Sequence, residues 1–208
     1  ENYDIYVMDH DGSNQVRLTT EASFDLSPTW LNPKSGVKVN EASVIINEDF
    51  DEPSMTAQQI SNMVKNSVVR IKADTKSGTA YGTGFIIRES GIIVTNNHVI
   101  SAKAEVTSIT VFLPRGDQYN GTVVARDIIH DLALVKIEAD NLSIIEIGSL
   151  SNASSGQQVV VLGYPLGNQS VSVTSGLIST VAYDDGRNTT WIQTDSAINP
   201  GNSGGALV

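Results

Sequence analysis

The sequence predicts a mainly β protein in which short strands form a barrel or a sandwich. Runs rich in β-branched and other apolar residues alternate with turn residues such as Gly, Pro, Asp and Ser, and this spacing is typical of all-β folds. Only one segment shows helical periodicity. The predicted strands are 84–88, 92–96, 107–113, 119–126, 132–138, 158–162, 171–175, 177–183 and 189–194.

The one predicted helix is short and begins near Thr56. Thr56 and Gln59 have the spacing of a capping box, and Ile60, Met63 and Val64 recur at helical intervals. The sequence therefore predicts a short amphipathic helix that leads into the β domain.

A separate hairpin is predicted at the start of the chain. Residues 3–8 and 15–19 have strand character, and an Asp-Gly turn at 9–14 joins them. With the Ser-Pro-Thr-Trp corner at 27–30, this segment resembles one TolB-like β-propeller repeat. We interpret residues 1–36 as a partial propeller repeat; an unrelated surface hairpin is the alternative.

The segment 37–54 is acidic and has no sustained periodicity, so it is interpreted as a linker. Upstream of it, Asp9 and Asp11 have the alternate spacing that opens a calcium loop. Gly12 and Thr20 do not occupy the positions that such a loop needs for its glycine and its final glutamate. We predict a solvated turn here, and no metal site or cofactor in the chain.

Composition limits the classes of partner. The formal net charge is −10, from 13 basic and 23 acidic residues, which disfavours nucleic acid and anionic membrane surfaces. The chain contains no cysteine, so disulfides and thiolate metal sites are excluded. No apolar run approaches the roughly 20 residues of a membrane-spanning helix. We therefore predict polypeptide partners, with no membrane insertion within this chain.

Three separated motifs supply the groups of a nucleophilic hydrolase. A serine hydroxyl needs an imidazole as base, and the imidazole needs a carboxylate that fixes its tautomer. His98, Asp131 and Ser203 provide these groups. Their order along the chain matches the chymotrypsin arrangement and differs from those of subtilisin and the α/β-hydrolases.

Glycines surround Ser203 in the segment Asn199-Pro200-Gly201-Asn202-Ser203-Gly204-Gly205. Acyl transfer requires main-chain N–H groups close to the carbonyl oxygen that becomes an oxyanion, and glycine permits that approach. The N–H groups of Gly201 and Ser203 are therefore predicted as the oxyanion donors.

Residues from about 55 to 208 resemble the trypsin-like serine protease domain of the HtrA/Deg family. The matching segments occur in the family's order, at 82–87, 95–99, 131–137, 162–167, 173–176 and 193–205. The resemblance implies His98 as general base, Asp131 as its orienting partner and Ser203 as nucleophile. It also implies a chymotrypsin-like double β-barrel, with His98 and Asp131 on the first barrel and Ser203 on the second.

The same resemblance implies properties of the whole protein. Family members continue beyond the position of Val208 with strands that complete the second barrel, so we expect that barrel to be incomplete here. A PDZ domain commonly follows. The resemblance further implies an extracytoplasmic serine endopeptidase that acts on unfolded or damaged proteins and assembles as a homotrimer.

The residues before Ser203 predict the substrate preference. Trypsin-like enzymes that select Lys or Arg carry an aspartate six residues before the nucleophile, and this position is Ala197. A buried cation would find no counter-charge there, which is costly. We therefore predict a small or medium aliphatic residue before the scissile bond, with Ala197 and Ile198 contributing to its pocket.

Two alternatives to a protease remain. The Gly-x-Ser-x-Gly pattern around Ser203 also fits an α/β-hydrolase esterase, but that class needs its acid and histidine after the serine, and only five residues follow. The other alternative is a catalytically incompetent fragment that binds polypeptide without cutting it.

Overall fold

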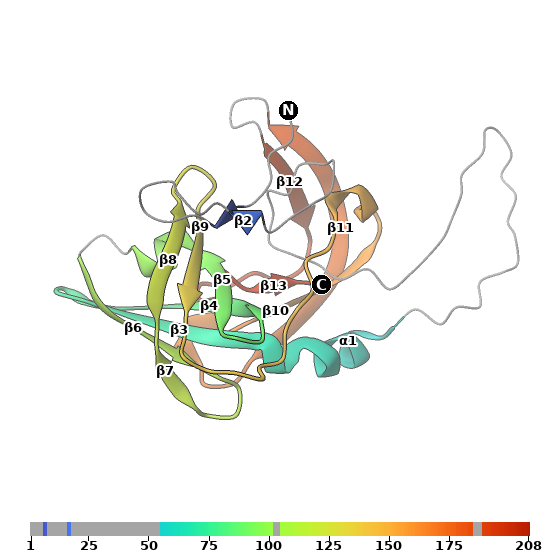
Figure 1. The fold of residues 1–208 in the computed structure, drawn as a ribbon. Helices are drawn as coiled ribbons and strands as arrows, with labels where there is room; N and C mark the ends of the chain where they lie inside the picture. Colours follow the sequence, from blue (N-terminus) through green and yellow to red (C-terminus); the bar gives the residue numbers. More distant parts are fainter. Residues whose placement is uncertain (1–5, 8–15, 18–54, 102–104, 185–188) are drawn as a thin grey trace, which may run out of the picture.

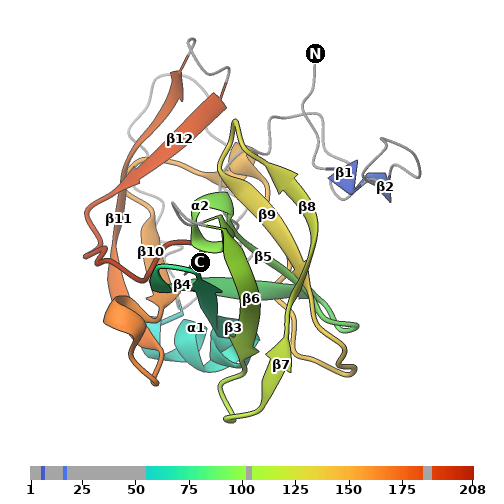
Figure 2. The ribbon, with the colours of Figure 1, turned by 90° about the vertical axis from the view of Figure 1, so that its left-hand side faces the viewer.

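The computed structural model describes residues 6–7, 16–17, 55–101, 105–184 and 189–208. The described residues from 55 onward form two curled sheets, one of seven strands and one of four. The sheets lie on opposite sides of the molecule (Figures 1 and 2). Helix α2 (Asn97–Ile100) packs on the seven-stranded sheet and contributes Val99 and Ile100 to its core. In the described part of the chain, no helix has the length and apolar character needed to cross a membrane.

The first sheet has the strand order β7-β6-β3-β4-β5-β9-β8, and every neighbouring pair is antiparallel. Its strands are β3 (Val68–Thr75), β4 (Gly78–Arg88), β5 (Ile92–Asn96), β6 (Val106–Phe112), β7 (Gln118–Asn120), β8 (Thr122–Asp127) and β9 (Leu132–Lys136). The predictions at 84–88, 92–96, 107–113 and 132–138 are confirmed, although β4 begins six residues earlier than predicted. Strand β3 had no predicted counterpart.

The predicted strand at 119–126 is divided at Gly121 into β7 and β8. Strand β7 pairs with β6, whereas β8 pairs with β9 at the opposite end of the strand order. A Cβ atom at Gly121 would lie 2.8 Å from side-chain atoms of both Ile109 and Val135, so the chain passes close to the barrel interior there. Because β7 and β8 are consecutive, the sheet closes on itself as a barrel. Counted as one bent strand, they give a barrel of six strands.

The second sheet has the order β12-β11-β10-β13 and is also antiparallel. Its strands are β10 (Gln158–Gly163), β11 (Ser172–Asp184), β12 (Thr189–Thr194) and β13 (Ala206–Leu207). The two strands predicted at 171–175 and 177–183 are one strand, β11, which continues through Gly176. Within the described residues this sheet has four strands, fewer than the six of a complete barrel.

The predicted helix is present as α1 (Ala57–Val64). The capping box is confirmed, because Gln59 N donates to Thr56 Oγ1 (3.2 Å) and Thr56 N donates to Gln59 Oε1 (2.8 Å). Val64 is buried, but Met63 is 62% exposed, so the packed face is narrower than predicted. The described residues also contain three short 3-10 helices: η1 (Lys65–Ser67), η2 (Leu150–Asn152) and η3 (Pro165–Gly167).

The two faces of the first sheet serve different cores, since successive strand residues point to opposite sides. Ile71 and Ile86 belong to a cluster inside the first barrel. Phe85 and Val68 belong to a second cluster that includes Leu162 of β10, and this second cluster therefore joins the two sheets. All five of these side chains are at most 1% exposed.

We expect replacement of Phe85 by alanine to destabilise the protein by about 3–5 kcal/mol, as large-to-small changes at buried aromatic residues do. The change would leave a cavity between the sheets. Chemical denaturation followed by circular dichroism would measure the loss, with Tyr81→Ala on the same strand as control, because Tyr81 is 43% exposed. Equal losses for the two variants would contradict this assignment of the core.

At the N-terminus, β1 (Tyr6–Val7) and β2 (Val16–Arg17) pair antiparallel, with Tyr6 opposite Arg17 and Val7 opposite Val16. The predicted hairpin is therefore confirmed in its pairing. The turn at 9–14, the corner at 27–30 and the linker at 37–54 lie outside the described residues. The propeller repeat and the domain boundaries stay predictions.

Candidate active site

The Asp131 carboxylate makes two hydrogen bonds to His98 on the first sheet, one to the imidazole ring and one to the main-chain N–H. His98 lies in α2, directly after β5, and Asp131 lies in the turn between β8 and β9. Nδ1 of His98 is 2.5 Å from Oδ2 of Asp131, and the main-chain N–H of His98 donates to Oδ1 at 2.8 Å. The carboxylate therefore fixes the ring at Nδ1 and leaves Nε2 as the nitrogen that can exchange a proton with another group.

The two residues before His98 also hold the main chain of Asp131 in place. The carbonyl oxygen of Asp131 accepts from Asn97 N (2.9 Å) and from Asn96 Nδ2 (2.9 Å). Asp131 has a φ of +57°, a left-handed conformation that aspartate tolerates better than most residues. Residues 96, 97 and 98 therefore all donate hydrogen bonds to Asp131. Within 95–99 only His98 was predicted to have a role, and the contact of Asn96 with Asp131 was not predicted.

Ser203 is presented by the loop between β12 and β13 of the second sheet. Main-chain hydrogen bonds from Asn202 N to Asn199 O (3.0 Å) and from Gly205 N to Asn202 O (2.8 Å) make this loop compact. Within the described part of the chain, the N–H groups of Gly201 and Ser203 donate to no acceptor. These two amides are therefore free to bind an added oxygen atom.

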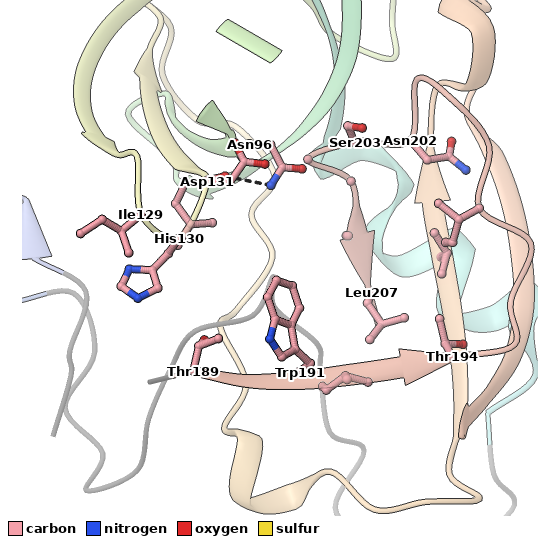
Figure 3. Close-up of a pocket in the computed structure, with 17 residues that line it drawn as sticks. Asn96, Ile129, His130, Asp131, Thr189, Trp191, Thr194, Asn202, Ser203 and Leu207 are labelled. Atoms are coloured by element: carbon pink, nitrogen blue, oxygen red, sulfur yellow. Dashed lines mark hydrogen bonds between the residues drawn. The ribbon is translucent and has the colours of Figure 1, made fainter. Parts of the chain in front are cut away.

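Asp131 and Ser203 line the same cavity of about 430 Å³. Figure 3 shows Asp131 and Asn96 on one side, Asn202 and Ser203 on the other, and the indole ring of Trp191 from β12 below them. His98 is not among the lining residues, and among the described residues no hydrogen bond joins it to Ser203. Catalytic hydrogen bonds are often long without substrate and tighten in the complex.

The two predicted specificity residues differ in their placement. Ile198 lines the cavity and is 58% exposed. Ala197 is not among the lining residues; its carbonyl oxygen accepts from Thr174 Oγ1 of β11 at 3.0 Å. The structure therefore brings Ile198, Asp131 and Ser203 to one cavity and places Ala197 outside its lining.

A second carboxylate–histidine pair, Asp127 and His130, lies directly before Asp131 in the chain. Nδ1 of His130 is 2.6 Å from Oδ2 of Asp127, and the main-chain N–H of His130 donates to Oδ1 at 3.0 Å. Burial raises the pKa of Asp127, but the hydrogen bonds and charge of His130 outweigh burial, and the net pKa lies below its usual value. The side chain of His130 is only 17% exposed and is paired with Asp127.

Metal ligands do not gather at this site. Within the described residues, no group of three or more His, Asp or Glu side chains is arranged to hold a metal ion. The groups available for chemistry are therefore the imidazole, the carboxylate, the hydroxyl and the free amides.

Both the backbone conformation and the surrounding atoms require glycine at position 201. Its φ is +100°, and a Cβ atom would lie 2.5 Å from Tyr164 O and 2.6 Å from Leu166 N. We expect Gly201→Ala to cost at least about 1–3 kcal/mol of stability, the usual range for such backbone strain. Because the loop must shift, we also expect a loss of about a hundredfold or more in turnover, as for a lost oxyanion donor.

Gly116 is the matched control for this change. Its φ is +97°, but no atom lies within 4 Å of a Cβ placed there. Gly116→Ala should show the cost of the conformation alone and leave activity unchanged. Denaturation curves and peptidase assays of both variants would separate strain from collision, and full activity of Gly201→Ala would contradict the assignment of its amide.

The two curled sheets, with an aspartate–histidine pair on one and a serine loop on the other, are typical of double-barrel serine peptidases. The family profile described as Trypsin-like peptidase domain matches residues 82–208, more than half of the chain. The chain belongs to this family.

Individual relatives agree with the family assignment. The chain is 32% identical to Serine protease Do-like HtrA of Lactobacillus helveticus, over 98% of this chain and 54% of the relative. It is 40% identical to a probable periplasmic serine endoprotease, DegP-like, of Rickettsia prowazekii, over 88% of this chain and 37% of the relative. The crystal structure of the serine endoprotease from Yersinia pestis matches with a TM-score of 0.64 and 34% identity, over 76% of this chain and 54% of that chain.

These likenesses confirm the predicted chymotrypsin-like double β-barrel and the resemblance of the peptidase part to HtrA and DegP proteins. The chain spans about half the length, or less, of the relatives it matches. The propeller repeat receives no support from these matches.

Proposed function

We propose that this chain forms the protease domain of an HtrA-type serine endopeptidase, with Ser203 as nucleophile, His98 as general base and Asp131 as its orienting partner. The observation that carries the proposal is the double hydrogen bond between Asp131 and His98, which commits Nδ1 and directs basicity to Nε2. Membership of the trypsin-like peptidase family supports it.

In the proposed reaction, Ser203 Oγ attacks the peptide carbonyl carbon while its proton passes to His98 Nε2. The carbonyl oxygen becomes an oxyanion that the amides of Gly201 and Ser203 bind, since both lack other acceptors in the described chain. The C–N bond then breaks as His98 returns the proton to the leaving amine, which gives an acyl-enzyme. Water, deprotonated by His98, hydrolyses this ester and restores Ser203.

The cellular role is proposed from the resemblance to the HtrA/Deg family. Unfolded or damaged polypeptides are the proposed substrates, and a homotrimer is the proposed assembly. An extracytoplasmic location is supported by the relatives whose names describe periplasmic endoproteases. The acidic net charge of −10 agrees with polypeptide rather than nucleic acid as the partner.

We expect peptides with valine or another aliphatic residue before the scissile bond to be cleaved faster than otherwise identical peptides with lysine or arginine. The reason is that Ala197 supplies no counter-charge and Ile198 lines the cavity beside Ser203. A pair of fluorogenic peptides that differ only at this residue would measure the ratio of kcat/KM. Faster cleavage after lysine would contradict the proposed preference.

The test of the proposal is covalent labelling by a fluorophosphonate, with the modified residue located by mass spectrometry. We expect labelling of Ser203 in the wild-type chain and none in Ser203→Ala. Such reagents report an activated serine together with an assembled oxyanion site. Absence of labelling in a folded wild-type sample would overturn the proposal for this chain.

The second candidate is a polypeptide-binding module without catalysis. It is favoured by one observation, the absence of a hydrogen bond between His98 and Ser203 among the described residues. A binder would retain affinity for an unfolded polypeptide with no turnover to lose, and the Ser203 variant discussed below separates the two.

A further inference from the structure

Thr83 of β4, on the first sheet, holds the serine loop of the second sheet. Its main-chain N–H donates to Ser203 O at 2.9 Å, and its hydroxyl donates to Gly201 O at 2.7 Å. The side chain is fully buried. Thr83 therefore binds the carbonyl groups of the two residues whose amides are the proposed oxyanion donors.

The hydroxyl of Thr83 both donates and accepts a hydrogen bond. Besides donating to Gly201 O, Oγ1 accepts from Tyr164 N at 2.9 Å, directly after β10 ends. A hydroxyl has one proton to give, so the bond from Tyr164 N leaves that proton committed to Gly201 O. A methyl group of the same size could make neither bond.

The neighbouring peptide is held from a different side. Leu166 N donates to Pro200 O at 2.7 Å. In a trans peptide the C=O and N–H groups point in opposite directions, so this bond turns the N–H of Gly201 away from Leu166. With Thr83 holding Gly201 O as well, both peptide groups that flank the Gly201 Cα atom are fixed in orientation.

We propose that Thr83 is a positioning residue whose hydroxyl sets the serine loop so that the amides of Gly201 and Ser203 point at one substrate oxygen. This inference rests on the proposed function, since it assigns a supporting group to the same site. Thr83 binds the carbonyl groups of the loop and does not itself touch the reacting atoms.

The expected effect is on turnover rather than on substrate binding. Oxyanion donors act only within a narrow distance range, and a misplacement of about 1 Å can cost about a hundredfold. We therefore expect Thr83→Val, which keeps the shape and removes the hydroxyl, to lower kcat about tenfold to a hundredfold with KM nearly unchanged. Thr83→Ser restores the hydroxyl and should recover most of the rate.

The control is Ser67→Ala. Ser67 is also fully buried, but its hydroxyl has no hydrogen-bond partner among the described residues. Removal of this hydroxyl should leave kcat unchanged, which shows that the effect at Thr83 arises from its bonds and not from deletion of a buried hydroxyl in general.

The experiment compares the full wild-type chain with the Val, Ser and Ala variants of Thr83, by fluorophosphonate labelling rate and by the amide resonances of Gly201 and Ser203 in a ¹⁵N–¹H spectrum. Slow labelling and displaced resonances in Thr83→Val, with both recovered in Thr83→Ser, would support the inference. Wild-type labelling and unmoved resonances in Thr83→Val would overturn it.

The two readouts keep this inference distinct from the proposed function. If the wild-type chain is not labelled, the proposed function fails, while the two amide resonances still decide whether Thr83 positions the loop. If Thr83→Val does not fold, Thr83→Ala removes the same hydroxyl without putting a methyl group in its place, and its comparison with Thr83→Ser gives the answer.

Discussion

Replacement of Ser203 by alanine is expected to lower peptide turnover at least about 10⁴-fold, the scale on which serine peptidases lose rate when a member of the triad is removed. The hydroxyl is the only atom group lost, and Ser203 contacts Thr83 through its main chain, so the loop should keep its shape. Turnover of an unfolded protein substrate and its binding, measured by fluorescence anisotropy, would be compared in the same samples.

This comparison separates the two proposed functions. A protease should lose turnover and keep affinity for the unfolded chain, whereas a binding module should show no turnover in either form. Ser151→Ala, at an exposed serine away from the cavity, is the control and should change neither quantity. Turnover by Ser203→Ala equal to that of the wild type would rule out Ser203 as nucleophile.

Asp131→Asn is expected to lower kcat about 10⁴-fold, the loss known for this change in a serine peptidase. Asparagine accepts the positive φ of +57° and can still accept from His98 N through its amide oxygen. Its amide nitrogen would then face Nδ1 of His98 and donate to it. The ring would carry its proton on Nε2, the wrong tautomer for a base that must receive the proton of Ser203.

Asp127→Asn is the matched control, because the same change falls on the similar pair Asp127–His130 four residues earlier. We expect it to reduce kcat less than about tenfold, since this pair holds the turn and does not orient the proposed base. Steady-state assays of both variants, with thermal melts to show that each is folded, would test this. Equal losses would contradict the assignment of Asp131.

Most of the fold could be predicted from local pattern. The capping box at Thr56 and Gln59 is a purely local signal, and the structure contains it. Strand β3 was missed although Val69, Ile71 and Ala73 alternate with Arg70, Lys72 and Asp74, and this period-2 pattern was available in the sequence. The division at Gly121 depends on two distant partner strands, so no local pattern could show it.

For the candidate site too, some features could be predicted from local pattern and others could not. His98, Asp131 and Ser203 each lie in a recognisable motif, and the structure joins the first two directly. The contacts of Asn96 and Thr83 were missed because they are made to residues 35 and 118 positions away. Hydrogen bonds of this range are created by the packing of the sheets, and a single sequence carries no periodic signal for them.

The apolar cluster that contains Phe85 and Leu162 and joins the two sheets has a consequence for how activity can be lost in evolution. Neither sheet by itself carries the full set of proposed reacting groups, since the imidazole and carboxylate belong to one and the hydroxyl to the other. The proposed chemistry therefore depends on how the two halves pack, and a substitution at their shared apolar surface can abolish it with every proposed reacting residue intact. A chain in this family can thus lose its activity without any change in the motifs by which it is recognised.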